Sequence, residues 1–226
     1  MKCKNLKVAI ADDHPLVICG LVKALEKESI EVAATASNAP ELLAALGEHK
    51  CDVVVTDYSM PHHNRLDGWR FLTALSSRHP DVPLLVYSEF DDPFLIGSLA
   101  QRGIEGLVSK RDEMSQVVTA IRRLAAGERY MSPVAHTSLC QFSSVPELRR
   151  FAGLSRRQME VAGLMLCGLS VGETARLLDR SANTISTQRT QACKRLGFAG
   201  EFDMYRFAAS HNLWLERSGS IPVTGW

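Results

Sequence analysis

Acidic, hydroxyl and amino side chains follow four separate apolar runs of the sequence, at the points where those runs end. Asp12 and Asp13 come after the first run, Asp57 after a later one, and Ser88 and Lys110 after two more. If these runs are parallel strands, their carboxyl ends meet at one edge of a sheet. Three carboxylates there repel one another, and a hard divalent cation such as Mg²⁺, bound by oxygen ligands, offsets that repulsion.

The same groups suit the transfer of a phosphoryl group to Asp57. An aspartate carboxylate can form an acyl phosphate, and the transfer depends chiefly on positioning and on charge neutralisation. Lys110 supplies a positive charge for the phosphoryl oxygens, and Ser88 supplies a hydroxyl donor. Each residue alone also fits a purely structural role, because Asp after a strand often caps a helix and Lys is usually solvated. Their joint occurrence favours a functional site, whereas His14, next to Pro15, is expected to pack or cap locally.

An alternation of short apolar runs with segments of helical period must position these residues. Three consecutive valines, Val53 to Val55, indicate a strand that is covered on both faces. Successive strand–helix units predict an α/β domain of flavodoxin-like (βα)5 architecture with a parallel sheet. The expected strands are 6–10, 30–36, 52–56, 84–88 and 104–108, and the expected helices are 16–27, 41–47, 69–78, 93–101 and 113–126.

The strand pattern stops after Gly127, and a different organisation follows. Residues 128–150 contain Pro133 and Pro146 and predict a linker with room for short helices. Helical periodicity then dominates. We therefore predict a first domain over 1–127, a linker over 128–150 and an all-α domain over 151–226, with four helices at 155–167, 171–178, 182–196 and 201–211.

Charge is divided unevenly between these regions, although the whole chain is nearly neutral at +1. Residues 1–127 carry 14 Lys and Arg against 17 Asp and Glu, whereas residues 128–226 carry 12 against 8. The basic excess is compatible with binding to nucleic-acid phosphates, although many solvated surfaces reach it by chance. The cysteines lack metal-ligand spacing, and no apolar stretch has the length of a signal peptide or a membrane span. A cytoplasmic protein with reduced thiols and no membrane partner is expected.

Residues 5–127 resemble the receiver domain of two-component response regulators. The matching residues are Asp12-Asp13, Asp57, Met60-Pro61, Asp67-Gly68, Ser88 and Lys110. The resemblance implies that Asp57 accepts phosphate and that Ser88 and Lys110 contact the phosphoryl group. It also implies Mg²⁺ as the cofactor, bound by Asp13, Asp57 and the Ser59 carbonyl, with Asp12 in support.

Two departures from that family concern access to the site and the response to phosphate. A loop from His62 to Leu66 separates the Met60-Pro61 and Asp67-Gly68 pairs, and its length resembles the Rcs capsule-regulator subgroup. Leu107 stands where many receivers carry an aromatic residue that moves on phosphorylation. Tyr87, beside Ser88, is an alternative responder, but its position fits an orientation into the core equally well.

Residues 154–198 resemble the helix-turn-helix of the NarL/FixJ (LuxR-type) regulators. Gly168-Leu169-Ser170 falls at the turn of that motif, and Thr184-Ile185 falls where its recognition helix starts. Ser181 is a suitable N-cap for a helix in which Ile185, Ala192 and Leu196 form one apolar face. An ordinary amphipathic helix in a small bundle is the alternative for this helix alone, but it fits the whole motif poorly.

The remaining face of that helix is polar, as DNA recognition requires. By position in the family, Ser186, Thr187 and Thr190 lie toward base edges. Thr184, Arg189 and Lys194 are better placed for phosphates. Short hydroxylated side chains read bases less selectively than Arg or Asn, so specificity is expected to involve water, DNA shape or a dimer partner.

These features predict a DNA-binding transcription regulator, not an enzyme, controlled by phosphorylation of Asp57. The expected partners are promoter DNA, a sensor histidine kinase or phosphotransfer protein, and a second copy of the chain. A Mg²⁺-dependent phosphohydrolase is an alternative with the same nucleophile, but Ser59 stands where such enzymes usually have a second Asp. A further alternative is DNA binding independent of phosphate, with an auxiliary regulator forming a heterodimer, and Leu107 favours it mildly.

Overall fold

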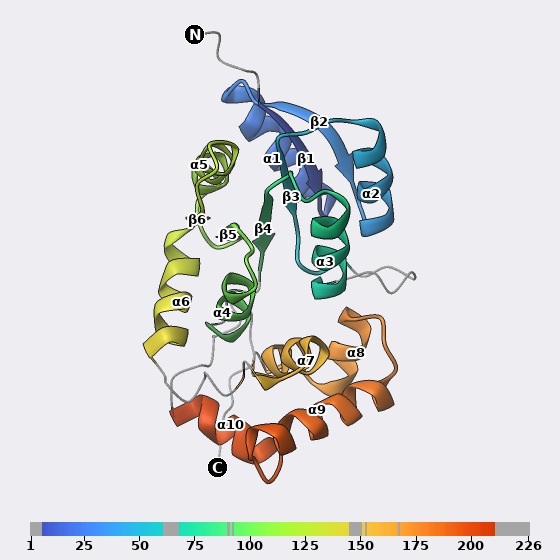
Figure 1. The fold of residues 1–226 in the computed structure, drawn as a ribbon, viewed down its shortest axis with the longest axis vertical. Helices are drawn as coiled ribbons and strands as arrows, with labels where there is room; N and C mark the ends of the chain where they lie inside the picture. Colours follow the sequence, from blue (N-terminus) through green and yellow to red (C-terminus); the bar gives the residue numbers. More distant parts are fainter. Residues whose placement is uncertain are drawn as a thin grey trace.

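The computed structural model describes residues 6–60, 68–89, 91, 93–144, 151, 153–166 and 168–210. Figure 1 shows a twisted sheet covered by helices in its upper part and a group of helices across its lower part. No helix within the described ranges is both long enough and apolar enough to cross a bilayer.

The sheet is parallel throughout, and its strands follow the order β2-β1-β3-β4-β5-β6. Because β1 has β2 on one side and β3 on the other, the carboxyl ends of β1 and β3 border the crevice where such sheets bind ligands. The five predicted strands are confirmed, and a sixth joins them. The strands are β1 (Lys7–Ala11), β2 (Glu31–Ala36), β3 (Val53–Thr56), β4 (Leu84–Ser88), β5 (Gly106–Ser109) and β6 (Tyr130–Met131).

Helices cover both faces of this sheet, because successive strand residues point to opposite sides. Val8 and Ile10 belong to one core with α1 (Pro15–Lys27) and α5 (Met114–Ala125). Ala9 and Ala11 belong to the other core, with α2 (Ala39–Glu48), α3 (Gly68–Arg78) and α4 (Pro93–Gln101). The unbroken valine run of β3 is therefore buried on both sides.

The segment predicted as a linker, 128–150, instead continues the α/β domain over much of its length. Tyr130 and Met131 form β6, which pairs with Gly106 and Leu107 of β5. The following helix, α6 (Pro133–Ser144), lies against α4. A Cβ on Gly97 of α4 would lie 2.3 Å from the Phe142 ring of α6, so glycine allows this close packing. Residues 145–150 lie outside the described residues.

The C-terminal helices confirm the predicted arrangement of four helices. Ser170 and Glu173 form a capping box at the start of the second, and Ser181 caps the third through the Thr184 amide. Gly197 ends the third helix with φ +79°, a left-handed conformation that favours glycine. The helices are α7 (Arg156–Leu166), α8 (Val171–Leu177), α9 (Ala182–Leu196) and α10 (Glu201–Ser210).

Candidate functional site

The acidic site lies where β1 and β3 end side by side. Ala11 pairs with Thr56, and the Asp57 amide donates a hydrogen bond of 2.9 Å to the Ala11 carbonyl, which brings the following Asp12 and Asp57 together. Both aspartates are buried, with 1% and 5% of their surface exposed. The backbone therefore places two buried carboxylates side by side at this edge of the sheet.

Lys110 supplies the cation that balances them. Its ammonium lies 2.7 Å from Asp12 Oδ2, as an ion pair, and 2.9 Å from Asp57 Oδ2, to which it donates a hydrogen bond. The Lys110 amide donates to the Ser88 carbonyl at 2.8 Å, which brings the buried Ser88 to the same edge of the sheet. The Tyr87 ring is buried in the core, with its centroid 5.8 Å from the ammonium, so the orientation of Tyr87 into the core is the one observed.

The acidity of Asp57 is strongly perturbed by this environment. Burial raises the pKa of Asp57 from 3.8 to about 6, the positive charge and hydrogen bond of Lys110 oppose that rise, and the charge of Asp12 adds to it. For Lys110, burial lowers the pKa, but its attraction to the two carboxylates outweighs burial and the pKa is raised overall. At neutral pH the lysine is therefore charged and most of Asp57 is ionised.

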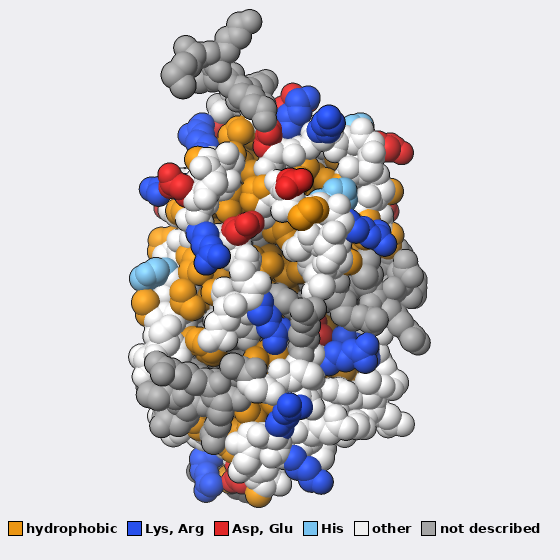
Figure 2. All heavy atoms as spheres, in the orientation of Figure 1, with side chains coloured by type: hydrophobic (Ala, Val, Ile, Leu, Met, Phe, Trp, Pro, Cys, Tyr) orange, Lys and Arg blue, Asp and Glu red, His pale blue; other side chains and the backbone are white. Residues whose placement is uncertain are grey.

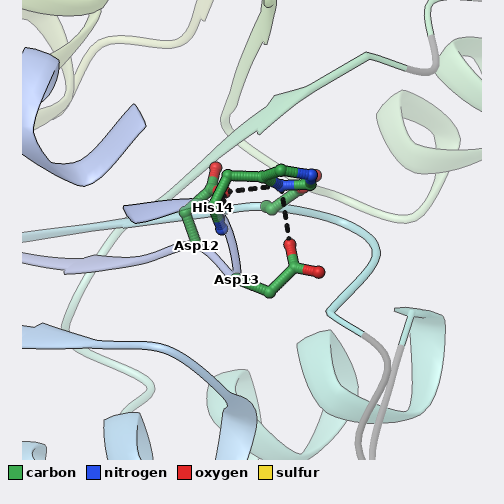
Figure 3. Close-up of side chains that lie close together, drawn as sticks. Asp12, Asp13 and His14 are labelled. Atoms are coloured by element: carbon green, nitrogen blue, oxygen red, sulfur yellow. Dashed lines mark hydrogen bonds and ion pairs between the residues drawn. The ribbon is translucent and has the colours of Figure 1, made fainter. Parts of the chain in front are cut away.

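His14 takes part in the acidic cluster more directly than predicted. Its Nδ1 lies 3.2 Å from Asp12 Oδ1 and 3.0 Å from Asp13 Oδ1 (Figure 3). The imidazole makes no capping hydrogen bond to α1, although His14 is the N-cap residue. It therefore lies against the outer side of the carboxylates, while Lys110 lies against Asp12 and Asp57.

The donor set suits a hard divalent cation. Single ligand atoms of Asp12, Asp13, His14 and Asp57 all lie within 4.8 Å of one another. Carboxylate oxygens are the ligands that Mg²⁺ prefers. Ser59 is buried beside them, its amide donates to Asp57 Oδ1 at 3.4 Å, and its hydroxyl has no hydrogen-bond partner among the described residues. The predicted loop His62–Leu66, with Pro61 and Asp67, lies outside the described residues.

A second polar network next to this site was not predicted. Asp91, in the loop after β4, is buried and accepts a hydrogen bond of 3.0 Å from the Ser109 hydroxyl and one of 3.3 Å from Arg111. Its carbonyl accepts a hydrogen bond from Ser138 of α6. The residues on both sides of Lys110 are thereby connected to α6. No sequence pattern distinguishes Asp91 from the other acidic residues of its loop.

The polar face of α9 is open to solvent. Its exposed residues include five of the six predicted DNA contacts, Thr184, Ser186, Thr187, Thr190 and Lys194. The hydroxyls of Thr187 and Thr190 donate to the carbonyls of Asn183 and Ser186 in their own helix, at 2.9 and 3.1 Å. They therefore present acceptor lone pairs and methyl groups outward. Figure 2 shows Lys and Arg side chains outnumbering acidic ones on the lower, helical part of the visible face.

Arg189, the sixth predicted contact, does not lie on that face. It is 3% exposed, and its guanidinium is 2.8 Å from Glu201 and donates to the Tyr205 hydroxyl, both in α10. The prediction of a phosphate contact is corrected here, because these partners occupy the guanidinium. The helical period of the sequence already indicates that Arg189 is buried. Arg189 follows Ile185 by four residues and precedes Ala192 by three, which puts it on the buried face of α9.

Comparisons with known proteins identify a family for each of the two domains. Residues 8–122 match the response regulator receiver domain family, and residues 152–208 match the bacterial regulatory proteins of the luxR family. The transcriptional regulatory protein RcsB of Escherichia coli (strain K12) is 29% identical over 210 residues, covering 92% of this chain and 96% of RcsB. The oxygen regulatory protein NreC of Staphylococcus epidermidis is 29% identical over 217 residues, covering 92% of this chain and 99% of NreC.

Solved structures give the same result. A structure of the RcsB response regulator of Salmonella typhimurium has a TM-score of 0.70 and 28% identity, covering 92% of this chain and 98% of that one. RcsB of Salmonella enterica serovar Typhimurium bound to promoter P1flhDC with the phosphomimetic BeF3⁻ has a TM-score of 0.69 and 28% identity, covering 92% of this chain and all of the other. The chain belongs to the response regulators and combines a receiver domain with a LuxR-type DNA-binding domain.

Proposed function

We propose that phosphorylation of Asp57 controls promoter binding by α9 in this DNA-binding response regulator. The observation that carries the proposal is the arrangement of Lys110 between the buried carboxylates of Asp12 and Asp57. It provides an ionisable nucleophile and a fixed positive charge in one poorly solvated site. We place this activity in the cytoplasm.

The phosphodonor in this proposal is a phosphohistidine of a sensor kinase or phosphotransfer protein. A carboxylate oxygen of Asp57 bonds to phosphorus as the phosphorus–nitrogen bond breaks and the donor imidazole leaves. Lys110 and the Ser88 hydroxyl stabilise the phosphoryl oxygens. Asp12, Asp13, Asp57 and the Ser59 carbonyl hold Mg²⁺, which when bound neutralises charge on the carboxylates and the phosphoryl group.

On the DNA side, Ser186, Thr187 and Thr190 face bases, and Thr184 and Lys194 face phosphates. The acceptor lone pairs and methyl groups of the threonines suit exocyclic amino groups and thymine methyl groups in the major groove. The chain binds as a homodimer, in line with a structure in which two RcsB dimers are bound to two parallel DNAs. Symmetric half-sites would then double the few contacts that one α9 makes.

The test compares DNA affinity with and without acetyl phosphate and Mg²⁺, on a duplex selected from a random pool by the phosphorylated chain. Intact-mass measurement confirms phosphate occupancy. Wild type is expected to bind more tightly after phosphorylation, whereas Asp57→Ala gains neither mass nor affinity. Equal affinity and equal oligomeric mass before and after confirmed phosphorylation would refute the proposal and favour control by an auxiliary partner, the scheme to which Leu107 points.

A further inference from the structure

A hydrogen-bonded chain of three side chains runs from the phosphoacceptor to the start of the recognition helix. Tyr58, which directly follows Asp57, donates its hydroxyl to Glu160 Oε1 of α7 at 3.2 Å. Arg180 lies 3.1 Å from Glu160 Oε2, and it directly precedes Ser181, the N-cap of α9. We propose that Glu160 is a positioning residue that latches the DNA-binding domain to the unphosphorylated receiver and so lowers its affinity for DNA.

We call the hydrogen-bonded side chains of Tyr58, Glu160 and Arg180 the latch. The latch is buried and polar, which suits a contact that can be opened. The side chain of Glu160 is 2% exposed and that of Arg180 is 12% exposed. The Nη1 atom of Arg180 is also buried, and it has no hydrogen-bond partner within the described part of the chain. Glu160 and Arg180 both belong to the DNA-binding domain, so their ion pair holds the Glu160 carboxylate in one geometry, and the Tyr58 hydroxyl supplies the hydrogen bond that crosses from the receiver. Losing the Tyr58 hydroxyl therefore shifts the balance toward separated domains.

The surroundings of Glu160 bring the two domains into close contact at this point. α7 lies next to α3 and α4 of the receiver, as Figure 1 also shows. Gly68, at the start of α3, has φ +54°, and a Cβ there would lie 2.4 Å from Glu160 Oε1. Beside this polar contact, Phe142 of α6 belongs to the core of the DNA-binding domain, together with Phe151 and Met159. The interface therefore combines apolar packing with the buried hydrogen bond from Tyr58 to Glu160.

The latch gives phosphorylation a direct route to α9. A phosphoryl group adds about −1.5 to −2 charges at Asp57, and it competes for the Lys110 ammonium that now holds that side chain. The residue displaced with Asp57 is Tyr58, whose partner Glu160 is itself negative. Since Ser186, Thr187 and Lys194 are already exposed, the receiver does not act by covering them. It acts by fixing the orientation of their domain, a step that rests on the proposed function.

The experiment uses the unphosphorylated full-length chain and removes one atom or one charge at a time. Tyr58→Phe deletes only the hydroxyl, and Glu160→Gln keeps the shape but replaces the charged acceptor of that hydroxyl with a weaker, neutral one. The matched controls are Tyr130→Phe, whose hydroxyl bonds to Gln116 within the receiver, and Glu128→Gln, whose exposed carboxylate pairs with Arg123. Two readouts are taken: DNA affinity on a duplex selected by wild type, and amide hydrogen exchange over 68–78 and 156–166.

Both latch variants are expected to bind DNA on the order of tenfold more tightly than unphosphorylated wild type, with faster exchange in both segments. The double variant is expected to show no more than the larger single effect, because both changes act on the same hydrogen bond between Tyr58 and residue 160. Wild-type affinity and exchange in the two single variants would overturn the latch, as would faster exchange without a gain in affinity. Failure of wild type to respond to confirmed phosphorylation instead refutes the proposed function, because the latch readouts need no phosphate.

Discussion

Replacement of Asp57 by Asn is expected to stabilise the receiver in metal-free buffer, although it removes the phosphoacceptor. The pKa of Asp57 is raised from 3.8 to about 6, so the folded receiver binds a proton at this site more tightly than the unfolded chain does. Ionisation therefore costs stability, and the cost grows as pH rises from about 4 to about 6. At 1.36 kcal/mol for each pKa unit, the penalty is about 1 kcal/mol at pH 4.5 and about 3 kcal/mol at pH 7. Asp57→Asn removes it.

The assay is urea unfolding followed by circular dichroism, at pH 4.5 and pH 7, with EDTA present. Asp81→Asn is the matched control, because Asp81 is exposed and lies at the opposite edge of the sheet. The increase in the free energy of unfolding caused by Asp57→Asn should be larger at pH 7 than at pH 4.5 by about 2 kcal/mol, since other groups titrate alike in both proteins. Mg²⁺ should narrow the gap at pH 7, because it stabilises the wild-type carboxylate through binding. An Asn variant less stable than wild type at pH 7, or a gain independent of pH, would refute this reasoning.

Four further variants test other parts of the site and the DNA-binding surface. Lys110→Met should destabilise the receiver at pH 7 by about 3 kcal/mol in urea unfolding, because it leaves two buried carboxylates without their cation, and a wild-type midpoint would contradict this. His14→Ala should tighten Mg²⁺ binding in calorimetry, because the imidazole lies against oxygens that the metal needs; unchanged or weaker binding would count against that competition. Lys194→Ala should keep the unfolding midpoint and reduce the salt slope of DNA binding by about 1. Arg189→Met should instead lower the unfolding midpoint. A lowered midpoint for Lys194→Ala and a reduced salt slope for Arg189→Met would restore Arg189 as the phosphate contact.

The sequence predicted the elements of both domains because their signals are local. Polar residues at strand ends identified the edge where Asp12, Asp57 and Lys110 meet, and helical periodicity with Ser181 and Gly197 marked the bounds of α9. Strand β6 was missed because a strand of two residues has no periodicity to detect, and its pairing with β5 supplies the structure. The assignment of Arg189 was wrong because position in the family does not determine which face of α9 is buried, whereas the phase of Arg189 relative to Ile185 and Ala192 does.

The contacts between domains could not be predicted in the same way. Tyr58 and Glu160 are 102 positions apart, and no sequence pattern pairs them. Their meeting depends on how α7 lies against α3 and α4, which local propensity does not determine. The same holds for Asp91 and Ser138, which join the end of β4 to α6.

The most direct test of the central claim is the DNA affinity of wild type and Asp57→Asn, with and without beryllium fluoride and Mg²⁺, on one selected duplex at one salt concentration. The account predicts that the phosphate mimic strengthens wild-type binding on the order of tenfold and leaves the Asn variant unchanged. Equal strengthening in both proteins, or none in wild type with the mimic bound, would contradict control through Asp57.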